Sequence, residues 1–132
     1  MAWQPVLVPM TLRFEIFPAD LDATAQFYTS VLGFALVTDD RNASEPYLYL
    51  QRDGVRIGAV ERARFDRSEQ RRPPVGVEIV LEVDDVGAEH GRVVGSSWPI
   101  AEDLQDHPWG LRDFRLLDPD GYYLRITSRR SH

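Results

Sequence analysis

The sequence contains no cysteine. A disulfide, a thiol nucleophile and a thiolate metal site are therefore excluded. The absence agrees with a reducing compartment, where disulfides are rare, so we expect a cytoplasmic protein.

The sequence also lacks a long apolar run. Its first residues, Met1 to Met10, are apolar but few, follow no basic segment and include Pro5 and Pro9. A helix that spans a membrane needs about 20 apolar residues, and a secretory signal begins with basic residues. We therefore expect neither a signal peptide nor a membrane partner.

Positive charge is in the minority. The 132 residues include 15 Lys and Arg against 21 Asp and Glu, which gives a net charge of −6, and the positive charge is carried by arginine. An acidic surface repels the phosphates of nucleic acid, so nucleic acid is not an expected partner. It favours cationic ligands, although a modest negative charge more commonly serves solubility alone.

The first half of the chain follows a strand, helix and hairpin pattern. Thr11 to Phe17 alternates apolar and polar residues as a strand does. Asp20 can cap a helix whose apolar residues recur at helical spacing as far as Gly33, a natural helix stop. Two more strand-like runs follow, Tyr47 to Arg52 and Val55 to Val60. The intervening Asp53-Gly54 predicts a type I′ turn, in which both central residues have positive φ.

The second half repeats this pattern. Val77 to Val83 alternates like a strand, and Asp84 or Asp85 can cap a helix over Val86 to Val94 that Gly95 ends. A second hairpin is predicted from Phe114 to Leu117 and Tyr122 to Thr127, across the turn Asp118-Pro119-Asp120-Gly121.

Three pairs of landmarks recur at nearly one offset. By subtraction, Asp20 and Asp84 are 64 residues apart, Gly33 and Gly95 are 62 apart, and Gly54 and Gly121 are 67 apart. A period of roughly 65 residues predicts a duplication. The joint between the copies ends in two prolines, which cannot donate to a sheet, so it is predicted to be a linker.

The predicted organisation is a single domain, 1–132, with a first module at 11–61, a linker at 62–75 and a second module at 76–128. One helix covers only one face of a module's sheet. Two such modules side by side predict an α+β fold, with a curved mixed sheet, helices on its convex face and a concave trough that binds a ligand.

Two motifs resemble a known superfamily. Asp20 to Phe34 (DLDATAQFYTSVLGF) resembles the first-helix signature of the vicinal-oxygen-chelate superfamily, which includes glyoxalase I, extradiol dioxygenases, fosfomycin-resistance enzymes and bleomycin-resistance proteins. Asp118 to Tyr122 (DPDGY) is similar to its closing hairpin, and Pro108 to Phe114 (PWGLRDF) to the stretch before that hairpin in bleomycin-resistance-like members. The resemblance covers about Leu12 to Thr127. It implies two βαβββ modules, the glyoxalase/bleomycin-resistance fold, and commonly a homodimer.

The enzymes of this superfamily usually hold a divalent metal with four side chains. Carried over to this sequence, the four positions are Arg13, Gly58, Glu78 and Arg125. Arginine has no lone pair for a metal, and one carboxylate cannot supply the three or four ligands that zinc or catalytic iron needs. A shifted register in the fourth strand would nominate Glu61 instead of Gly58, but on the other face of the sheet. We therefore expect no metal, no other cofactor and no catalytic residue.

Arg13, Glu78 and Arg125 are expected to converge where the ion lies in the enzymes. In the structural interpretation, which is slightly favoured, they form a salt-bridged cluster that closes a vestigial site. In the functional interpretation, the spare guanidinium anchors an anionic or carbonyl group of a ligand.

Carboxylates and aromatic rings complete the expected ligand-binding set. Strand parity places Glu15, Glu78 and Glu82 on the trough face with Arg13, and Tyr123 on one face with Arg125. Planar groups stack on aromatic rings, although core packing or loop anchoring is the commoner role of any single ring. The predicted ligand-binding residues are Arg13, Glu15, Tyr47, Tyr49, Glu78, Glu82, Trp109, Tyr123 and Arg125.

Three functions remain open at this point. The first is a metal-free homodimer that sequesters a planar or cationic natural product, as bleomycin-resistance proteins do. The second is a metal-dependent lyase, isomerase or dioxygenase of the same superfamily. The third is a structural or partner-binding module with a vestigial trough.

Overall fold

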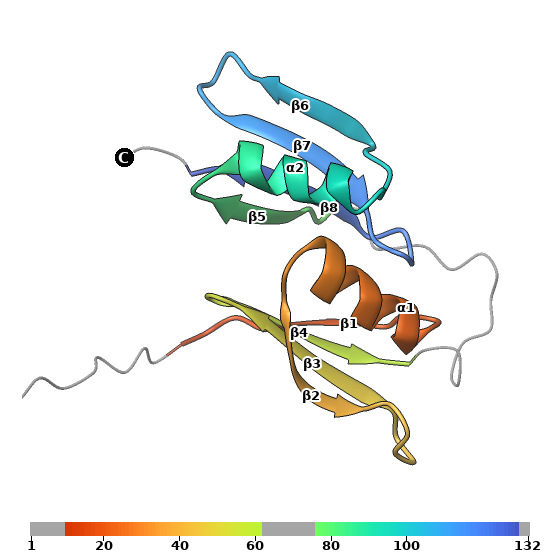
Figure 1. Ribbon diagram of the computed structural model, residues 1–132. Helices are drawn as coiled ribbons and strands as arrows, with labels where there is room; N and C mark the ends of the chain where they lie inside the picture. The colour runs from red at the N-terminus through yellow and green to blue at the C-terminus, as the bar shows by residue number, and fades with distance from the viewer. Residues whose placement is uncertain (1–9, 62–75, 130–132) are drawn as a thin grey trace, which may run out of the picture.

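Each half of the chain folds into one helical segment and four strands in the computed structural model, which describes residues 10–61 and 76–129 (Figure 1). The first half contains β1 (Phe14–Ile16), α1 (Leu21–Gln26), η1 (Phe27–Val31), β2 (Ala35–Asp40), β3 (Tyr47–Arg52) and β4 (Val55–Val60). The second half contains β5 (Ile79–Val83), α2 (Val86–Gly95), β6 (Glu102–Asp106), β7 (Arg112–Leu117) and β8 (Tyr123–Ser128). The βαβββ order occurs twice, which confirms the predicted α+β class. The predicted linker, 62–75, lies outside the described residues.

Each module forms its own four-stranded mixed sheet. The strand order is β1-β4-β3-β2 in the first sheet and β5-β8-β7-β6 in the second. β1 is parallel to β4 and β5 is parallel to β8, whereas the other neighbouring strands are antiparallel. Among the described residues, β1 and β5 are therefore edge strands, and no strand pairing joins the two sheets.

Both helices begin at an aspartate. The Asp20 carboxylate accepts hydrogen bonds from the backbone N–H of Asp22 and Ala23, at 2.9 and 3.3 Å. Of the two caps considered for the second helix, Asp85 is used, since its Oδ1 accepts from Ala88 N at 3.0 Å. The first helix widens into a π-turn, η1, and then stops at Gly33, whose φ of 74° suits glycine. α2 includes Gly95, so it is one residue longer than predicted.

The hairpin between β3 and β4 has the predicted position but not the predicted turn type. Arg52 pairs with Val55, so Asp53 and Gly54 are the two turn residues. Asp53 has a φ of 50°, whereas Gly54 is not among the glycines with positive φ. A type I′ turn needs positive φ at both positions, so the type I′ prediction is wrong.

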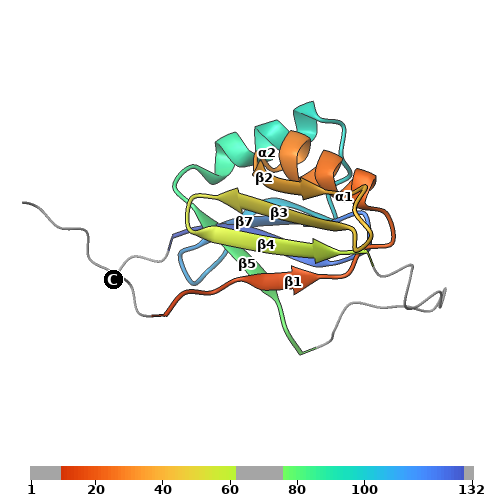
Figure 2. The same cartoon turned by 90° about the horizontal axis from the view of Figure 1, so that it is seen from below.

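Apolar side chains of both modules meet in one core. The inner face of the first sheet contributes Leu48, Leu50, Ile57 and Ala59, and that of the second contributes Phe114, Leu116, Leu124 and Ile126. Each inner face packs against the helix of its own module. In Figure 2, β3, β4 and β1 lie in front with no helix over them, and both helices lie along one side of the molecule. We call the two sheet faces that the helices leave uncovered the first and second outer faces.

The modules contact one another through helices and turns. The Tyr28 hydroxyl donates to Asp118 Oδ2 at 2.8 Å, and the rings of Phe27 and Trp98 lie 4.8 Å apart. The guanidinium of Arg52, at the end of β3, pairs with Glu89 on α2. Because these contacts come from the helical side, they leave both outer faces available.

Candidate ligand-binding site

The first outer face is built from one row across three strands. Glu15 on β1 pairs in register with Gly58 on β4, and Gly58 pairs with Tyr49 on β3. Tyr47 is two residues from Tyr49 and shares its side of the strand. Burial first, and the neighbouring Glu15 carboxylate second, raise the pKa of Tyr47. This face therefore combines a carboxylate with two phenol rings.

Glu15 occupies the space above Gly58. A Cβ added at position 58 would clash with the Glu15 carboxylate, so no larger side chain fits unless Glu15 moves. The other oxygen, Oε1, pairs with Arg13 Nε at 3.0 Å. Glu15 Oε2 is buried and has no hydrogen-bond partner among the described residues. Position 58 is glycine here because the carboxylate of the neighbouring strand fills its place.

The second outer face carries a network of two arginines and two glutamates. Arg125 on β8 and Arg115 on β7 are partners in register, and Arg115 is paired with Glu102 on β6. Glu78 Oε1 lies 3.3 Å from Arg125 Nε and 3.6 Å from Arg115 Nη2. Arg115 Nη1 donates to Glu102 Oε2 at 2.6 Å. Since the two positive charges face two negative charges, the network is neutral as a whole.

Tyr123 extends this network at its edge. Its hydroxyl donates to Glu102 Oε2 at 3.0 Å, and the Arg115 guanidinium lies 5.9 Å from its ring centre. The bonds from Arg115 and then from Tyr123 lower the pKa of Glu102, whereas burial and the bond to Glu102 raise the pKa of Tyr123. Glu102 therefore stays ionised and Tyr123 stays neutral, which fixes the direction of their hydrogen bond.

The expected cluster of Arg13, Glu78 and Arg125 does not form within one chain. Arg13 pairs with Glu15 on the first outer face, whereas Glu78 pairs with Arg125 and Arg115 on the second. The sheets are separate, so the two halves of the expected cluster belong to different faces. Arg115 and Glu102 were not predicted. Arg115 shares the strand parity of Asp113 and Leu117, and this alternation is the one sequence signal that points to it.

The residues at the four superfamily ligand positions do not fit a divalent metal. Gly58 has no side chain, and both arginines are donors that pair with glutamates. Across residues 10–61 and 76–129, no three His, Asp or Glu side chains gather in a way that could hold a metal ion.

A histidine and an aspartate that the sequence did not predict as site residues, His107 and Asp113, meet beside Trp109. His107 Nε2 lies 2.7 Å from Asp113 Oδ1, and the Trp109 ring is stacked on the imidazole at 4.3 Å. Trp109 is 59 % exposed. The loop between β6 and β7 thus presents an exposed indole that is stacked on His107.

A mainly apolar cleft of about 600 Å³ separates the two edge strands. On one side it is lined by Phe14 of β1 and by Leu12, which precedes β1. On the other side it is lined by Val80 of β5 and by Val77, which precedes β5. Three of the predicted residues, Glu15, Glu78 and Tyr123, also line this cleft. Of these lining residues, Leu12 and Val77 are largely exposed to solvent, at 78 % and 72 %.

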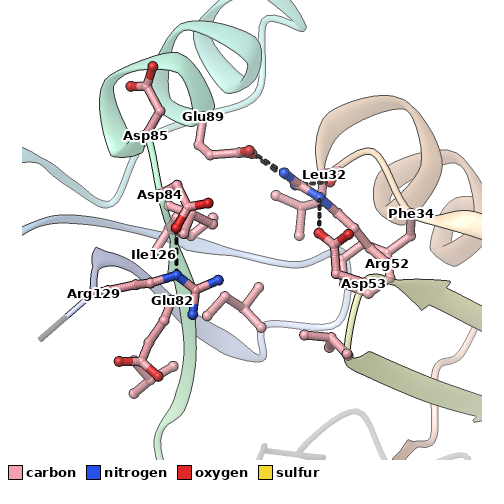
Figure 3. Close-up of a pocket in the computed structure, with 15 residues that line it drawn as sticks. Leu32, Phe34, Arg52, Asp53, Glu82, Asp84, Asp85, Glu89, Ile126 and Arg129 are labelled. Carbon is pink, nitrogen blue, oxygen red and sulfur yellow. Dashed lines mark hydrogen bonds and ion pairs between the residues drawn. The ribbon is translucent and has the colours of Figure 1, made fainter. Parts of the chain in front are cut away.

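A second cleft, of about 470 Å³, opens between the β3–β4 turn and the start of α2 (Figure 3). Its cations are already paired. Arg52 reaches across to Glu89 and to the carbonyl of Leu32, and Arg129 pairs with Asp84 at 2.6 Å. Glu82 is the one predicted ligand-binding residue that lines this cleft. The two clefts share Gly54, Val55, Val80 and Leu81, so they meet between the β3–β4 hairpin and β5.

The predicted ligand-binding residues thus fall into three places. Arg13, Glu15, Tyr47 and Tyr49 lie on or beside the first outer face, Glu78, Glu82, Tyr123 and Arg125 lie on or beside the second, and Trp109 is in the β6–β7 loop. Within one chain, Glu15 of the first group shares the cleft between β1 and β5 with Glu78 and Tyr123 of the second, and the other members of the two groups do not line this cleft. Among the described residues, no helix is long and apolar enough to cross a membrane.

Known proteins share this fold. The model of the glyoxalase/bleomycin resistance protein/dioxygenase superfamily matches residues 11–126. TioX from Micromonospora sp. ML1 is 21 % identical, with a TM-score of 0.74 over 92 % of this chain and 99 % of that one. A superfamily member from Sphaerobacter thermophilus DSM 20745 is 18 % identical, with a TM-score of 0.73 over 94 % and 100 % of the two chains. Lactoylglutathione lyase from Agrobacterium tumefaciens is also 18 % identical, with a TM-score of 0.68 over 92 % and 94 %. No curated protein sequence matches the chain.

Proposed function

Because the chain belongs to the glyoxalase/bleomycin resistance protein/dioxygenase superfamily, we propose that it is a metal-independent small-molecule-binding protein of that superfamily. Its ligand is a planar or cationic natural product, and its working form is a cytoplasmic homodimer. Its role is to sequester an antibiotic, and hence to confer resistance, without chemistry on the bound molecule.

The observation that carries the proposal is the pairing at the metal-ligand positions. Arg13 and Arg125 are each held by a glutamate, and the Glu15 carboxylate fills the space of the missing side chain at Gly58. A guanidinium repels a dication and offers it no lone pair. With these side chains in place, binding does not depend on a metal.

Aromatic rings and a guanidinium supply the contacts to the ligand in this proposal. Trp109 and Tyr123 are 59 % and 39 % exposed, and stacking on such rings contributes roughly 0.5–1.5 kcal/mol beyond the buried area. The Arg125 guanidinium, beside Glu78, is the proposed partner of a ligand carbonyl or carboxylate. The carboxylates of Glu15, Glu78 and Glu82 favour a cationic group.

A second copy of the chain completes the trough. Each outer face is open along its edge strand, and β1 and β5 each have one strand neighbour among the described residues. We propose that the first outer face of one chain meets the second outer face of its partner. Arg13 and Glu15 of one chain would then face Glu78 and Arg125 of the other. The cluster of Arg13, Glu78 and Arg125 expected within one chain would thus form between two chains.

The dimer gives a first test. Leu12 is 78 % exposed and lines the cleft beside β1, so Leu12→Glu places a charge where the partner is proposed to dock. We expect the association of the variant to be at least roughly tenfold weaker in sedimentation velocity, because burying an unpaired charge is costly. The matched control is Val94→Glu, on α2 and 53 % exposed, which should leave the dimer intact. A monomeric wild type would contradict the proposed assembly.

Metal content tests the absence of a cofactor. After incubation with zinc, nickel, manganese and ferrous ions and then desalting, we expect less than about a tenth of an equivalent of each metal per chain, because functional sites retain their ions. Elemental analysis provides the measurement. A content near one equivalent would show that the site assignment is wrong and would favour a metal-dependent lyase, isomerase or dioxygenase. A chain that binds neither metal nor any planar compound would instead favour a structural module.

A further inference from the structure

We propose that His107 and Asp113 are positioning residues: together they hold the Trp109 indole as a preformed stacking surface for a planar aromatic ligand. The inference rests on the proposed function, since it assigns the open face of Trp109 to the bound molecule. It adds two residues that touch no ligand themselves and act through Trp109.

The stacking geometry leaves one indole face for a ligand. The Trp109 and His107 rings are nearly parallel, with an interplanar angle of 7° and 4.3 Å between their centres. One face of the indole is therefore covered by the imidazole. Since Trp109 is still 59 % exposed, its uncovered face is directed to solvent. A planar ring that stacks on this face would complete a three-layer arrangement.

The imidazole is itself fixed by a buried carboxylate. The side chains of His107 and Asp113 are 14 % and 4 % exposed, and their hydrogen bond measures 2.7 Å. Asp113 is near the start of β7, an inner strand of the second sheet, and is paired with Gln105 on β6 and Thr127 on β8. Its other oxygen, Oδ2, is buried and has no hydrogen-bond partner among the described residues. His107 thus supplies the hydrogen bond that this buried carboxyl group needs, and the bond keeps the imidazole in place.

The backbone of the loop brings Trp109 to this pair without fixing its side chain. His107 N donates to Leu111 O at 2.9 Å, and Gly110 N donates to His107 O at 3.0 Å. Gly110 has a φ of 87°, which lets the chain reverse in a short loop. These hydrogen bonds fix the position of the Trp109 backbone. The rotamer of the Trp109 side chain is fixed by the stack on His107. Ordering a side chain on binding costs affinity, so an indole ordered in advance binds more tightly.

Fluorine NMR of the full chain labelled with 5-fluorotryptophan tests the positioning role without a ligand. The chain has three tryptophans, and Trp109→Phe assigns one of the three signals to Trp109. In Asp113→Ala and His107→Ala, we expect the Trp109 signal to narrow and to move towards that of free 5-fluorotryptophan. Asp113→Asn keeps an acceptor for the imidazole and should retain the wild-type signal. Trp98 donates to Leu117 O from the core side, so its signal reports that each variant is folded.

A binding measurement with riboflavin, a planar neutral ring system, provides the second arm. We expect Asp113→Ala and His107→Ala to weaken riboflavin binding by roughly three- to tenfold, the range for one extra immobilised side chain. Trp109→Ala should weaken it more. If Trp109→Ala weakens binding while Asp113→Ala does not, the inference is overturned and the proposed function stands. An unchanged Trp109 signal in both alanine variants overturns it as well. If the wild type does not bind riboflavin, the proposed ligand class is wrong, and the fluorine signals alone decide the positioning role.

Discussion

Replacing Asp118 with alanine is expected to lower the free energy of unfolding by about 3–5 kcal/mol, because three buried or half-buried donors lose their acceptor. Asp118 is 4 % exposed. Its Oδ2 accepts from the Tyr28 hydroxyl at 2.8 Å, and its Oδ1 accepts from the backbone N–H of Asp120 and of Tyr122, both at 2.9 Å. The same carboxylate therefore holds the β7–β8 turn and joins the second module to the first helical segment.

Asp118→Asn separates the hydrogen bonds from the charge. The amide oxygen can take over both backbone bonds, and the amide nitrogen can donate to the Tyr28 hydroxyl. Burial raises the pKa of Asp118, so the ionised carboxylate carries a desolvation cost at neutral pH that asparagine avoids. We expect this variant to stay within about 1 kcal/mol of wild type.

Urea unfolding followed by circular dichroism measures both variants. Asp106→Ala is the matched control, because the Asp106 side chain is 86 % exposed and its ion pair with Arg112 is long, at 3.7 Å. It should change the stability by less than about 0.5 kcal/mol. A loss below about 1 kcal/mol for Asp118→Ala would mean that water replaces the carboxylate and that the module contact is weak.

The fold was readable from the sequence where side chains alternate between core and solvent. In β3, the buried Leu48 and Leu50 alternate with half-buried residues, and this strand was predicted within its observed bounds. β2 and β6 were not predicted as individual strands. Four of the five residues of β6 are exposed, because β6 is the outer edge of its sheet and buries almost nothing. An edge strand of this kind gives no period-two signal, so its pairing with β7 can be known only from the structure.

Strand parity predicted which candidate site residues share a face of a strand, but the sequence could not predict which strands lie close together. Parity placed Glu15 with Arg13, and Tyr123 with Arg125. It could not show that the two groups lie on separate sheets within one chain, because that depends on how the modules pack. The sequence gives no signal for His107, because no second metal or catalytic partner lies at a familiar spacing from it. The loop nevertheless folds it onto Asp113, six residues later in the chain.

The contact between Arg52 and Glu89 is a further feature that sequence could not give, since the two residues are 37 positions apart and come from different modules. Arg52 Nη1 donates to the Leu32 carbonyl at 2.7 Å and to Glu89 Oε2 at 2.9 Å, and Nη2 pairs with Glu89 Oε1 (Figure 3). The hydrogen bond to Glu89 is the largest influence that raises the pKa of Arg52. A bidentate pair of this kind fixes the orientation of α2 against the β3–β4 turn.

Arg52→Ala is expected to cost about 2–4 kcal/mol of unfolding free energy, because it leaves the Glu89 carboxylate, only 8 % exposed, without its cation. This loss of unfolding free energy is smaller than that expected for breaking a fully buried ion pair, because the Arg52 side chain is 28 % exposed. Removing both charges should recover most of the loss. We expect Arg52→Met combined with Glu89→Leu to lie within about 1 kcal/mol of wild type, because apolar residues of similar size replace a buried pair at little cost.

A double-mutant cycle of Arg52→Ala and Glu89→Ala, measured by urea unfolding, isolates the coupling between the two side chains. We expect a coupling of about 1–3 kcal/mol. The control is Arg129→Ala, because the Arg129 side chain lines the same cleft but is 62 % exposed beside Asp84, so its loss should cost less than that of Arg52. If Arg52→Ala costs no more than Arg129→Ala, the pair is screened by solvent in the cleft. The modules would then be held together by the core around Tyr28 rather than by this ion pair.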